Sequence, residues 1–504
     1  MNEEIKKEFV NYLSKSNIML EAGALPLDLA ESEVNTLAEA IISIKTATET
    51  GSLKIVSKED IEKALQNIRN NAVAKMPEPI EINRTASFKP IAAEVEAIYK
   101  IEPYSCDRVE GSVNDFISYF RDRLNKIRNL FDTPRYSIIE NIALLKNFTE
   151  GRQVAICGIV SNKIVTKNGN IMVILEDETG EVKVIFMNSS SLSGKKIFES
   201  ASKIITDEVL VVVGKISGPF VIASELLWPD IPIKEQKVIE DDIAIAFISD
   251  IHVGSKLFME KNFTKMLEWI NGNVNSKSRS LAGKIKYIII GGDIVDGIGI
   301  YPGQERDLAV TDIYKQYSIM SRFLENLPEY IQIFILPGNH DAVQRSEPQP
   351  EFPDKFLEIK QSNVHKVPNP LYINLHGLDV VSYHGASLDS IIGAIPGMSY
   401  AKPEEAMIEL LKRRHLSPIY GGNMIVPSKN DSLVMQRVPD ILHMGHIHKN
   451  GIANYHGTLV INSGTWQSRT DFQIKQGHIP TPCNLPVFEA KNYKVTTIDF
   501  SGVI

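Results

Sequence analysis

The chain has 504 residues, of which 43% are hydrophobic and 23% charged, and its formal net charge is −8. These proportions are typical of a soluble globular protein, and the length predicts two to four domains rather than a single core. No apolar run approaches the ~20 residues that cross a bilayer, and residues 1–7 lack the apolar stretch of a signal peptide. The three cysteines form no CxxC pair, which excludes a zinc ribbon and suits a reducing cytoplasm.

The negative charge limits how this chain could bind a nucleic acid. A protein that binds nucleic acid alone usually has a basic surface, because phosphate neutralisation supplies much of the affinity. A net charge of −8 leaves three alternatives: a small substrate, a local basic patch, or a partner subunit that holds the polymer.

Residues 1–70 are predicted to form a small helical module. Apolar residues recur there at helical spacing, and Ser57 followed by Asp60 resembles a capping box that opens a helix at 58–68. No pattern in this region indicates chemistry, so we interpret it as an interaction or tethering module.

Residues 71–112 are predicted to be a linker, because prolines recur there without clear periodicity. Residues 113–149 return to helical spacing and are predicted to be a helical connector. Its basic residues favour a solvated helix face; they are Arg121, Arg123, Lys126, Arg128 and Arg135.

Residues 150–235 are predicted to form a β-barrel. A β-branched run at 153–160 is followed by turns at 167–170 and 179–180. The strand order and the sequence Ile-Leu-Glu-Asp-Glu-Thr-Gly at 174–180 resemble the OB-fold of nucleic-acid-binding proteins. The region is poor in aromatic residues and balanced in charge, so a structural barrel and a strand-binding barrel both remain open.

All eleven histidines lie between His252 and His478. Five segments rich in His, Asp, Asn and Gly each follow an apolar strand, which predicts loops at one edge of a sheet. They are Asp250-Ile251-His252, Gly291-Gly292-Asp293-Ile294-Val295-Asp296, Gly338-Asn339-His340-Asp341, Tyr383-His384-Gly385 and Gly445-His446-Ile447-His448. Imidazole, carboxylate and amide oxygen are ligands of Mn²⁺, Fe²⁺ or Zn²⁺. Residues 240–504 are therefore predicted to be a metal-dependent catalytic domain.

The five segments, in this order and spacing, resemble the calcineurin-like metallophosphoesterase family. The resemblance implies a four-layer α/β domain, a β-sandwich flanked by helices, within a multidomain α+β protein. It also implies two sets of metal ligands that share one bridging carboxylate. The sets are Asp250, His252, Asp293 and His448 for one cation, and Asp293, Asn339, His384 and His446 for the other. His340 matches the catalytic histidine, Asp341 would orient it, and Asp296 would support the site from outside the ligand sets.

These roles agree with the chemistry of phosphodiester hydrolysis. Two neighbouring cations lower the pKa of a bridging water and clamp the phosphodiester, and His340 can protonate the leaving oxygen. The remaining histidines are expected to be structural: His365, His376, His415, His456 and His478. The role of His443, in the strand before the last segment, is left open.

The whole layout resembles a narrower family, the small subunits of archaeal D-family DNA polymerases. A helical module, an OB-like barrel and a phosphoesterase domain follow one another there, and further agreement lies at 300–304, 347–350, 462–467 and 480–482. The resemblance implies a proofreading 3′→5′ exonuclease acting on single-stranded DNA or a primer end. It implies two divalent ions, Mn²⁺ before Fe²⁺ or Zn²⁺, and association with a large polymerase subunit whose hold on DNA would explain the acidic charge.

Two alternatives remain from other classes. Accessory subunits of eukaryotic polymerases have the same layout without the metal ligands, which makes a non-catalytic scaffold the main rival; every expected ligand position is filled here. A double-strand-break repair nuclease shares the catalytic motifs but usually begins at the Asp-x-His strand. A small-molecule phosphoesterase would leave the barrel unexplained.

Overall fold

The structure is a computed structural model that describes residues 10, 13–14, 18–20, 37, 41, 54–61, 88–103, 109–131, 135–273 and 278–502. The chain divides into two compact units, residues 1–79 and 80–504. Within the described part of the chain, none of the helices has the length and apolar content that a membrane span requires.

The predicted helical module lies mostly outside the described residues. Its described part contains β1 (Ile18–Leu20) and β2 (Lys54–Val56), which pair in parallel, so the expectation of helices alone is wrong. The capping box is confirmed: Ser57 N donates to Asp60 Oδ2 at 2.9 Å, Asp60 N donates to Ser57 Oγ at 3.3 Å, and residues 58–61 are helical.

Two six-stranded sheets form the centre of the C-terminal domain. The first has the order β12-β11-β10-β9-β18-β19 and is parallel from β9 to β12. Its strands are β9 (Ala244–Ile248), β10 (Ile285–Gly291), β11 (Gln332–Leu336), β12 (Val364–Lys366), β18 (Asn484–Glu489) and β19 (Lys494–Asp499).

The second sheet has the order β16-β17-β15-β14-β13-β3 and is parallel across β14, β15 and β17. Its strands are β3 (Tyr99–Ile101), β13 (Leu371–Leu375), β14 (Leu378–Ser382), β15 (Ile441–Met444), β16 (Asn450–Tyr455) and β17 (Thr458–Ser463).

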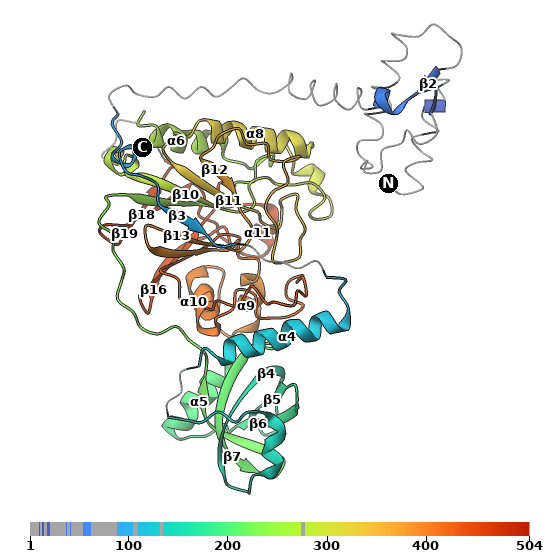
Figure 1. Cartoon of the computed structure of the whole chain (residues 1–504), viewed down its shortest axis with the longest axis vertical. Helices are drawn as coiled ribbons and strands as arrows, with labels where there is room; N and C mark the ends of the chain where they lie inside the picture. Colours follow the sequence, from blue (N-terminus) through green and yellow to red (C-terminus); the bar gives the residue numbers. More distant parts are fainter. Residues whose placement is uncertain are drawn as a thin grey trace. The chain divides into compact units, whose positions relative to one another are not determined.

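Helices cover the outer face of each sheet. The helices of the domain are α6 (Glu260–Ile270), α7 (Arg279–Ala282), α8 (Ile313–Glu325), α9 (Leu388–Ala394), α10 (Pro403–Arg413) and α11 (Asp471–Lys475), with the 3₁₀ turn η3 (Gln304–Arg306). Figure 1 shows α6 and α8 on the side of the first sheet and α9 and α10 on the side of the second. The expected four layers, helices, sheet, sheet and helices, are therefore present.

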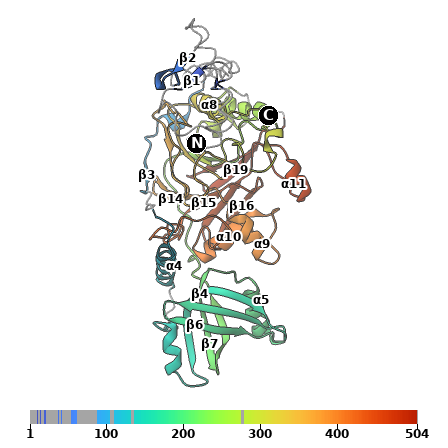
Figure 2. The ribbon, with the colours of Figure 1, turned by 90° about the vertical axis from the view of Figure 1, so that its right-hand side faces the viewer.

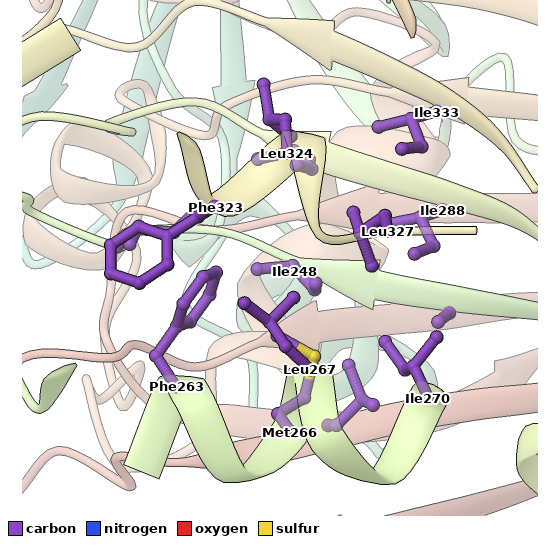
Figure 3. Packing of buried hydrophobic residues seen from close by; sticks show 14 of the residues in the cluster. Ile248, Phe263, Met266, Leu267, Ile270, Ile288, Phe323, Leu324, Leu327 and Ile333 are labelled. Atoms are coloured by element: carbon purple, nitrogen blue, oxygen red, sulfur yellow. The ribbon is translucent and has the colours of Figure 1, made fainter. Parts of the chain in front are cut away.

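Strand β9 explains how the layers hold together. Successive side chains of a strand point to opposite faces; Ala246 and Ile248 pack with the helices, whereas Ile245 and Phe247 pack between the two sheets. Both faces are buried, which is why the strand has an uninterrupted apolar sequence. Figure 3 shows α6 side chains, including Leu267, packed towards Ile248 and its neighbours.

The predicted linker contains ordered elements that the sequence did not reveal. The 3₁₀ turn η1 (Ile91–Ala93) is followed by β3, which pairs antiparallel with β13. The expectation of a linker is therefore wrong for this stretch. A three-residue strand is too short to show periodicity, yet it covers an edge of the sheet that would otherwise leave backbone groups unpaired.

The predicted connector begins with α4 (Val113–Arg128), capped by Ser112 and Asp115, and ends with the 3₁₀ helix η2 (Ile142–Asn147). The predicted barrel follows. It is a closed five-stranded barrel with the order β4-β5-β6-β8-β7 (Figure 2). Its elements are β4 (Gln153–Val165), β5 (Ile171–Asp177), β6 (Gly180–Phe186), α5 (Leu192–Ser202), β7 (Val209–Ser217) and β8 (Phe220–Leu227).

Two buried arginines join the barrel and α4 to the C-terminal domain. Arg123 of α4 is 0% exposed; its Nε lies 2.8 Å from Asp431 Oδ2, and it donates to the carbonyl oxygens of Asp207 and Pro418. The expectation of a solvated face is therefore wrong for this residue. We call the contacts of Arg123 and Arg413 the arginine junction.

Arg413 of α10 makes the second half of the arginine junction. Its Nε lies 2.6 Å from Glu208 Oε2, and its terminal nitrogen donates to the carbonyl oxygen of Lys203 at 2.7 Å. Both the arginine and Glu208 are buried, and Trp228 Nε1 donates to the same carboxylate. Each buried charge here has an opposite charge beside it, which is the condition for burying an ion pair.

Candidate metal centre

The ligand candidates lie where strands of the two sheets end. Asp250 and His252 follow β9, Asp293 follows β10, Asn339 follows β11, His384 follows β14, and His446 and His448 follow β15. Parallel neighbours end at the same edge of a sheet, so these loops meet. The placement expected from the sequence is confirmed for all five segments.

Several of these residues have an unusual backbone. Asp250, His252, Asp293, His446 and His448 all have positive φ, between 51° and 67°. Residues other than glycine rarely adopt this backbone conformation, which persists only where surrounding contacts fix it. Here the backbone N of His446 donates to the Asp250 carboxylate, and the N of His252 donates to the carbonyl of Asp293.

One group of donors gathers around Asp250. His252 Nε2 and His448 Nε2 lie 3.0 Å apart, and His448 Nε2 is 3.4 Å from Asp250 Oδ1. One ligand atom of each of these three residues lies within 4.8 Å of the others. Asp293 Oδ2 is 3.9 Å from His252 Nε2, which brings the expected first set together.

A second group gathers on the other side of Asp293. His384 Nε2 lies 3.4 Å from Asp293 Oδ2 and 2.8 Å from Asn339 Oδ1. The same Asn339 oxygen is 3.1 Å from His446 Nδ1. Asp293 therefore adjoins both groups, the position expected of a bridging carboxylate.

The far nitrogens of His384 and His446 have hydrogen-bond acceptors, and the far nitrogen of His252 lies beside a carboxylate. His252 Nδ1 lies 3.1 Å from Asp296 Oδ1, His384 Nδ1 lies 2.9 Å from the Gly291 carbonyl oxygen, and His446 Nε2 lies 2.9 Å from Asp389 Oδ2. A proton on that nitrogen leaves the nitrogen facing the centre with a free lone pair, as metal-binding histidines require. These three rings therefore present the lone pair that a divalent cation requires.

The buried charges also favour a cation. Asp250, Asp293 and Asp341 are all buried. Burial and the neighbouring Asp293 raise the pKa of Asp341 to about 7. Burial alone lowers the pKa of the His384 imidazole, but Asp293 outweighs it and raises that pKa to about 10. Carboxylates this close together demand positive charge, either from protons on the rings or from bound cations.

His340 lies beside this centre, with its ring centroid 4.7 Å from that of His252. Its backbone N donates to Asp293 Oδ1 at 2.8 Å, and its Nδ1 donates to the carbonyl oxygen of Asp296 at 2.8 Å. Burial lowers the pKa of the ring. The carbonyl fixes the proton on Nδ1, so Nε2 is the nitrogen that can exchange a proton with a ligand.

Asp341 does not orient His340 as expected. Its carboxylate accepts from the backbone N of Gly338 at 2.8 Å and from the hydroxyl of Tyr317 at 3.4 Å. It therefore holds the loop that carries Asn339 and His340. The orienting contact comes from the backbone carbonyl oxygen of Asp296 instead.

Two supporting residues were not predicted. Asp389 of α9 lies against His446, and Gln473 of α11 places its amide nitrogen 2.9 Å from His448 Nδ1. Neither belongs to a motif, and each reaches a ligand distant in sequence. A single acidic or amide residue on a helix does not indicate from sequence alone that it contacts such a histidine.

The four additional segments that carried the family resemblance support the ligand loops. Gln304 and Gln467 donate to the Asp296 carboxylate, at 3.1 Å each. Gln349 donates to the carbonyl oxygen of Gly338. The backbone N of Thr481 donates to the carbonyl oxygen of His448 at 2.9 Å. These segments thus hold the loops that end in the ligands.

The remaining histidines have structural partners, as expected. They contact Gln332 (His365), Tyr287 (His376), Asp431 (His415), Tyr455 (His456) and Tyr400 (His478). His443, whose role was open, lies between the hydroxyls of Ser382 and Ser463, at 2.8 and 3.0 Å. Burial lowers its pKa to about 3, so it is a neutral core residue.

Comparisons with known proteins identify relatives of this chain. The family model for the B subunits of DNA polymerases alpha and epsilon matches residues 245–451. The chain is 39% identical over 436 residues to the DNA polymerase II small subunit of Archaeoglobus fulgidus, an alignment covering 86% of each chain. It is 36% identical over 487 residues to the protein of the same name from Methanothermobacter thermautotrophicus, covering 95% of this chain and 97% of the relative.

Proposed function

Because the chain belongs to the family of archaeal DNA polymerase II small subunits, we propose that residues 240–504 degrade single-stranded DNA from its 3′ end as a proofreading exonuclease. The observation that carries this proposal is the convergence of eight side chains, Asp293 and seven others, from five loops. The large polymerase subunit is the partner, and its hold on DNA accounts for the net charge of −8.

Asp250, His252, His448 and Asp293 would hold one divalent cation, and Asp293, Asn339, His384 and His446 the other. Such cations supply Lewis-acid stabilisation of the phosphoryl oxygens and a nucleophilic water at neutral pH. Nitrogen and oxygen donors of this kind suit Mn²⁺, and also Fe²⁺ or Zn²⁺.

His340 would act on the leaving 3′ oxygen. The Asp296 carbonyl keeps a proton on Nδ1, so His340 would give a proton from Nε2 to the leaving oxygen only as the imidazolium, and it would leave the step as the neutral ring with its proton on Nδ1. A positioned acid of this kind contributes roughly 10²–10⁴-fold to the rate. The Asp341 carboxylate, through Gly338, would keep the loop in place.

The barrel at 150–235 would be an OB-fold, as its five-stranded closure and the helix α5 between its third and fourth strands suggest. Its contacts with the arginine junction support a structural role for at least one face. Residues 1–70 would tether the subunit to other replication proteins.

The test is hydrolysis of primers with matched and mismatched 3′ ends, with Mn²⁺ and with the complete complex of both subunits. We expect stepwise loss of 3′ nucleotides, faster at the mismatch, and its disappearance in Asp293→Ala and His340→Ala. Full activity in either variant would contradict the assigned chemistry. No hydrolysis by the unaltered complex would favour a non-catalytic scaffold, and cleavage without preference for polymerase primer ends would favour a repair nuclease.

A further inference from the structure

Residues 469–479, which include α11, form a short segment that we call the α11 rim. It is fixed at two points to the last pair of ligands. Gln473 is buried and its amide nitrogen lies 2.9 Å from Nδ1 of His448. The second point is His478, whose ring centroid lies 3.9 Å from that of Tyr400. The Tyr400 hydroxyl is hydrogen-bonded to Asp389, and Asp389 in turn contacts His446.

The α11 rim is also internally ordered. Thr470 and Gln473 form a capping box at the start of α11, and the backbone N of His478 donates to the carbonyl of Gln473 at 2.8 Å. The segment is thus a compact turn seated on the ligand loop rather than a loose loop. Figure 2 shows α11 at the outer edge of the C-terminal domain.

The outward side chains of this segment are apolar and unusually exposed. Phe472 is 67% exposed, Ile474 53% and Ile479 67%. Residues on either side of a helical position project about 100° away from it, so Phe472 and Ile474 flank the contact between Gln473 and His448. Several exposed apolar side chains within one short segment are a feature of interaction sites, whereas a single one needs no explanation.

Charge near this ring selects the partner. The α11 rim carries two cationic side chains, Arg469 and Lys475, and one anionic side chain, Asp471, in a protein whose net charge is −8. Lys475 follows Phe472 by three positions, which places ring and ammonium group on the same helix face. An aromatic surface with a neighbouring cation is the combination that binds a base and its phosphate.

We propose that Phe472 is a base-stacking residue that positions single-stranded DNA at the metal centre, with Lys475 contacting the backbone phosphate. The inference rests on the proposed exonuclease function, and it adds the position of the single-stranded DNA. A nucleotide stacked on Phe472 lies beside the His448 ligand, so the chain end is held while the bond is cleaved. Stacking does not depend on base identity, which suits an enzyme that removes any mismatched nucleotide.

The experiment compares Phe472→Ala and Phe472→Trp with the unaltered protein, each in complex with the large subunit. Loss of one stacked base corresponds to about five- to a hundredfold in kcat/KM for oligodeoxythymidylate. We expect that loss in Phe472→Ala and recovery in Phe472→Trp. Hydrolysis of bis(p-nitrophenyl) phosphate, which has no base, should be unchanged in both, and this also reports that the centre is intact.

A matched control and a matched substrate make the result decisive. Leu192→Ala removes an equally exposed apolar side chain from the barrel (74% exposed) and should change nothing. An oligomer whose 3′-terminal units lack bases should be degraded equally by the unaltered protein and Phe472→Ala. If the two proteins differ as much on this oligomer as on the normal one, stacking is wrong.

Two other outcomes would also overturn the inference. Equal kcat/KM of the two proteins on oligodeoxythymidylate would leave Phe472 without a role in binding DNA. Loss of the large subunit from Phe472→Ala during purification would make the α11 rim a protein interface instead. Failure of the proposed function gives a different result, because then the unaltered complex itself does not hydrolyse DNA, whether or not it hydrolyses bis(p-nitrophenyl) phosphate.

Discussion

The arginine junction and the metal centre both bury charged side chains, but they balance those charges differently. At the junction, Arg123 lies against Asp431 and Arg413 against Glu208, so each buried charge has its opposite within the protein. At the candidate metal centre, buried carboxylates lie together and imidazoles are the groups beside them that can become positive. Charges balanced within the protein hold domains together, and charges left unbalanced mark where a ligand binds.

The largest expected effect comes from unbalancing the junction. Arg123→Ala leaves the buried Asp431 carboxylate without its guanidinium partner, and removing one partner of a buried pair costs about 3–5 kcal/mol. We expect the free energy of unfolding, measured by urea titration, to fall by that amount. The double variant Arg123→Met/Asp431→Leu removes both charges and should recover most of it. A loss below about 0.5 kcal/mol, as for surface substitutions, would mean that the junction is not a buried ion pair.

Cation binding at the candidate metal centre should raise the free energy of unfolding. A ligand that binds only the folded state at 100 times its dissociation constant adds about 2.7 kcal/mol to the free energy of unfolding. We therefore expect Mn²⁺ to raise the melting temperature of the chelator-treated protein, and Asp250→Asn to weaken this response. A junction variant such as Glu208→Gln serves as control and should respond fully. An undiminished response in Asp250→Asn would place the cation elsewhere.

Asp389 provides a finer test of the centre. Its carboxylate holds the far nitrogen of His446, and loss of such a partner lowers metal affinity about 10–100-fold. We expect Asp389→Asn to weaken Mn²⁺ binding by this factor in calorimetry, with little change in unfolding. Asp379→Asn, a change of the same kind in β14, should leave binding unaltered. Equal affinity in Asp389→Asn would show that His446 needs no such support.

Lowering the pH should reduce the free energy of unfolding through the arginine junction, and this effect should be smaller. Burial and the nearby Arg123 lower the pKa of His415 to about 4, against an ordinary value near 6.5. The unfolded chain then binds the proton more readily, so stability is complete above pH 6.5 and falls as pH drops towards 4. We expect His415→Gln to flatten the pH dependence of unfolding in this window. An unchanged slope would show that His415 does not contribute.

The two regions also differ in how far sequence could predict them. Metal ligands are rare residue types placed directly after apolar strands, so Asp250-Ile251-His252 and Gly445-His446-Ile447-His448 stood out, and their convergence was confirmed. Arg123 looked like one basic residue on a helix face. Its partner Asp431 lies 308 residues away, and no periodicity connects them.

Within the candidate metal centre and within the fold, features marked by residue type were likewise predicted, and features that depend on tertiary contacts were missed. His340 was predicted from its motif, but the group that orients it, the Asp296 carbonyl, is a backbone atom that no residue type reveals. The layered sheets were predicted from long apolar strands such as β9, whereas β3 was missed because its pairing with β13 depends on tertiary contacts alone.

The left-handed backbone at five ligand positions affects how this domain can evolve. Each such residue costs about 1–3 kcal/mol, which the folded protein must offset elsewhere. Glycine at Asp250 or His448 would relieve that strain while destroying the site. A relative that does not use this site would therefore lose little by replacing these side chains, and it could keep the same architecture without them.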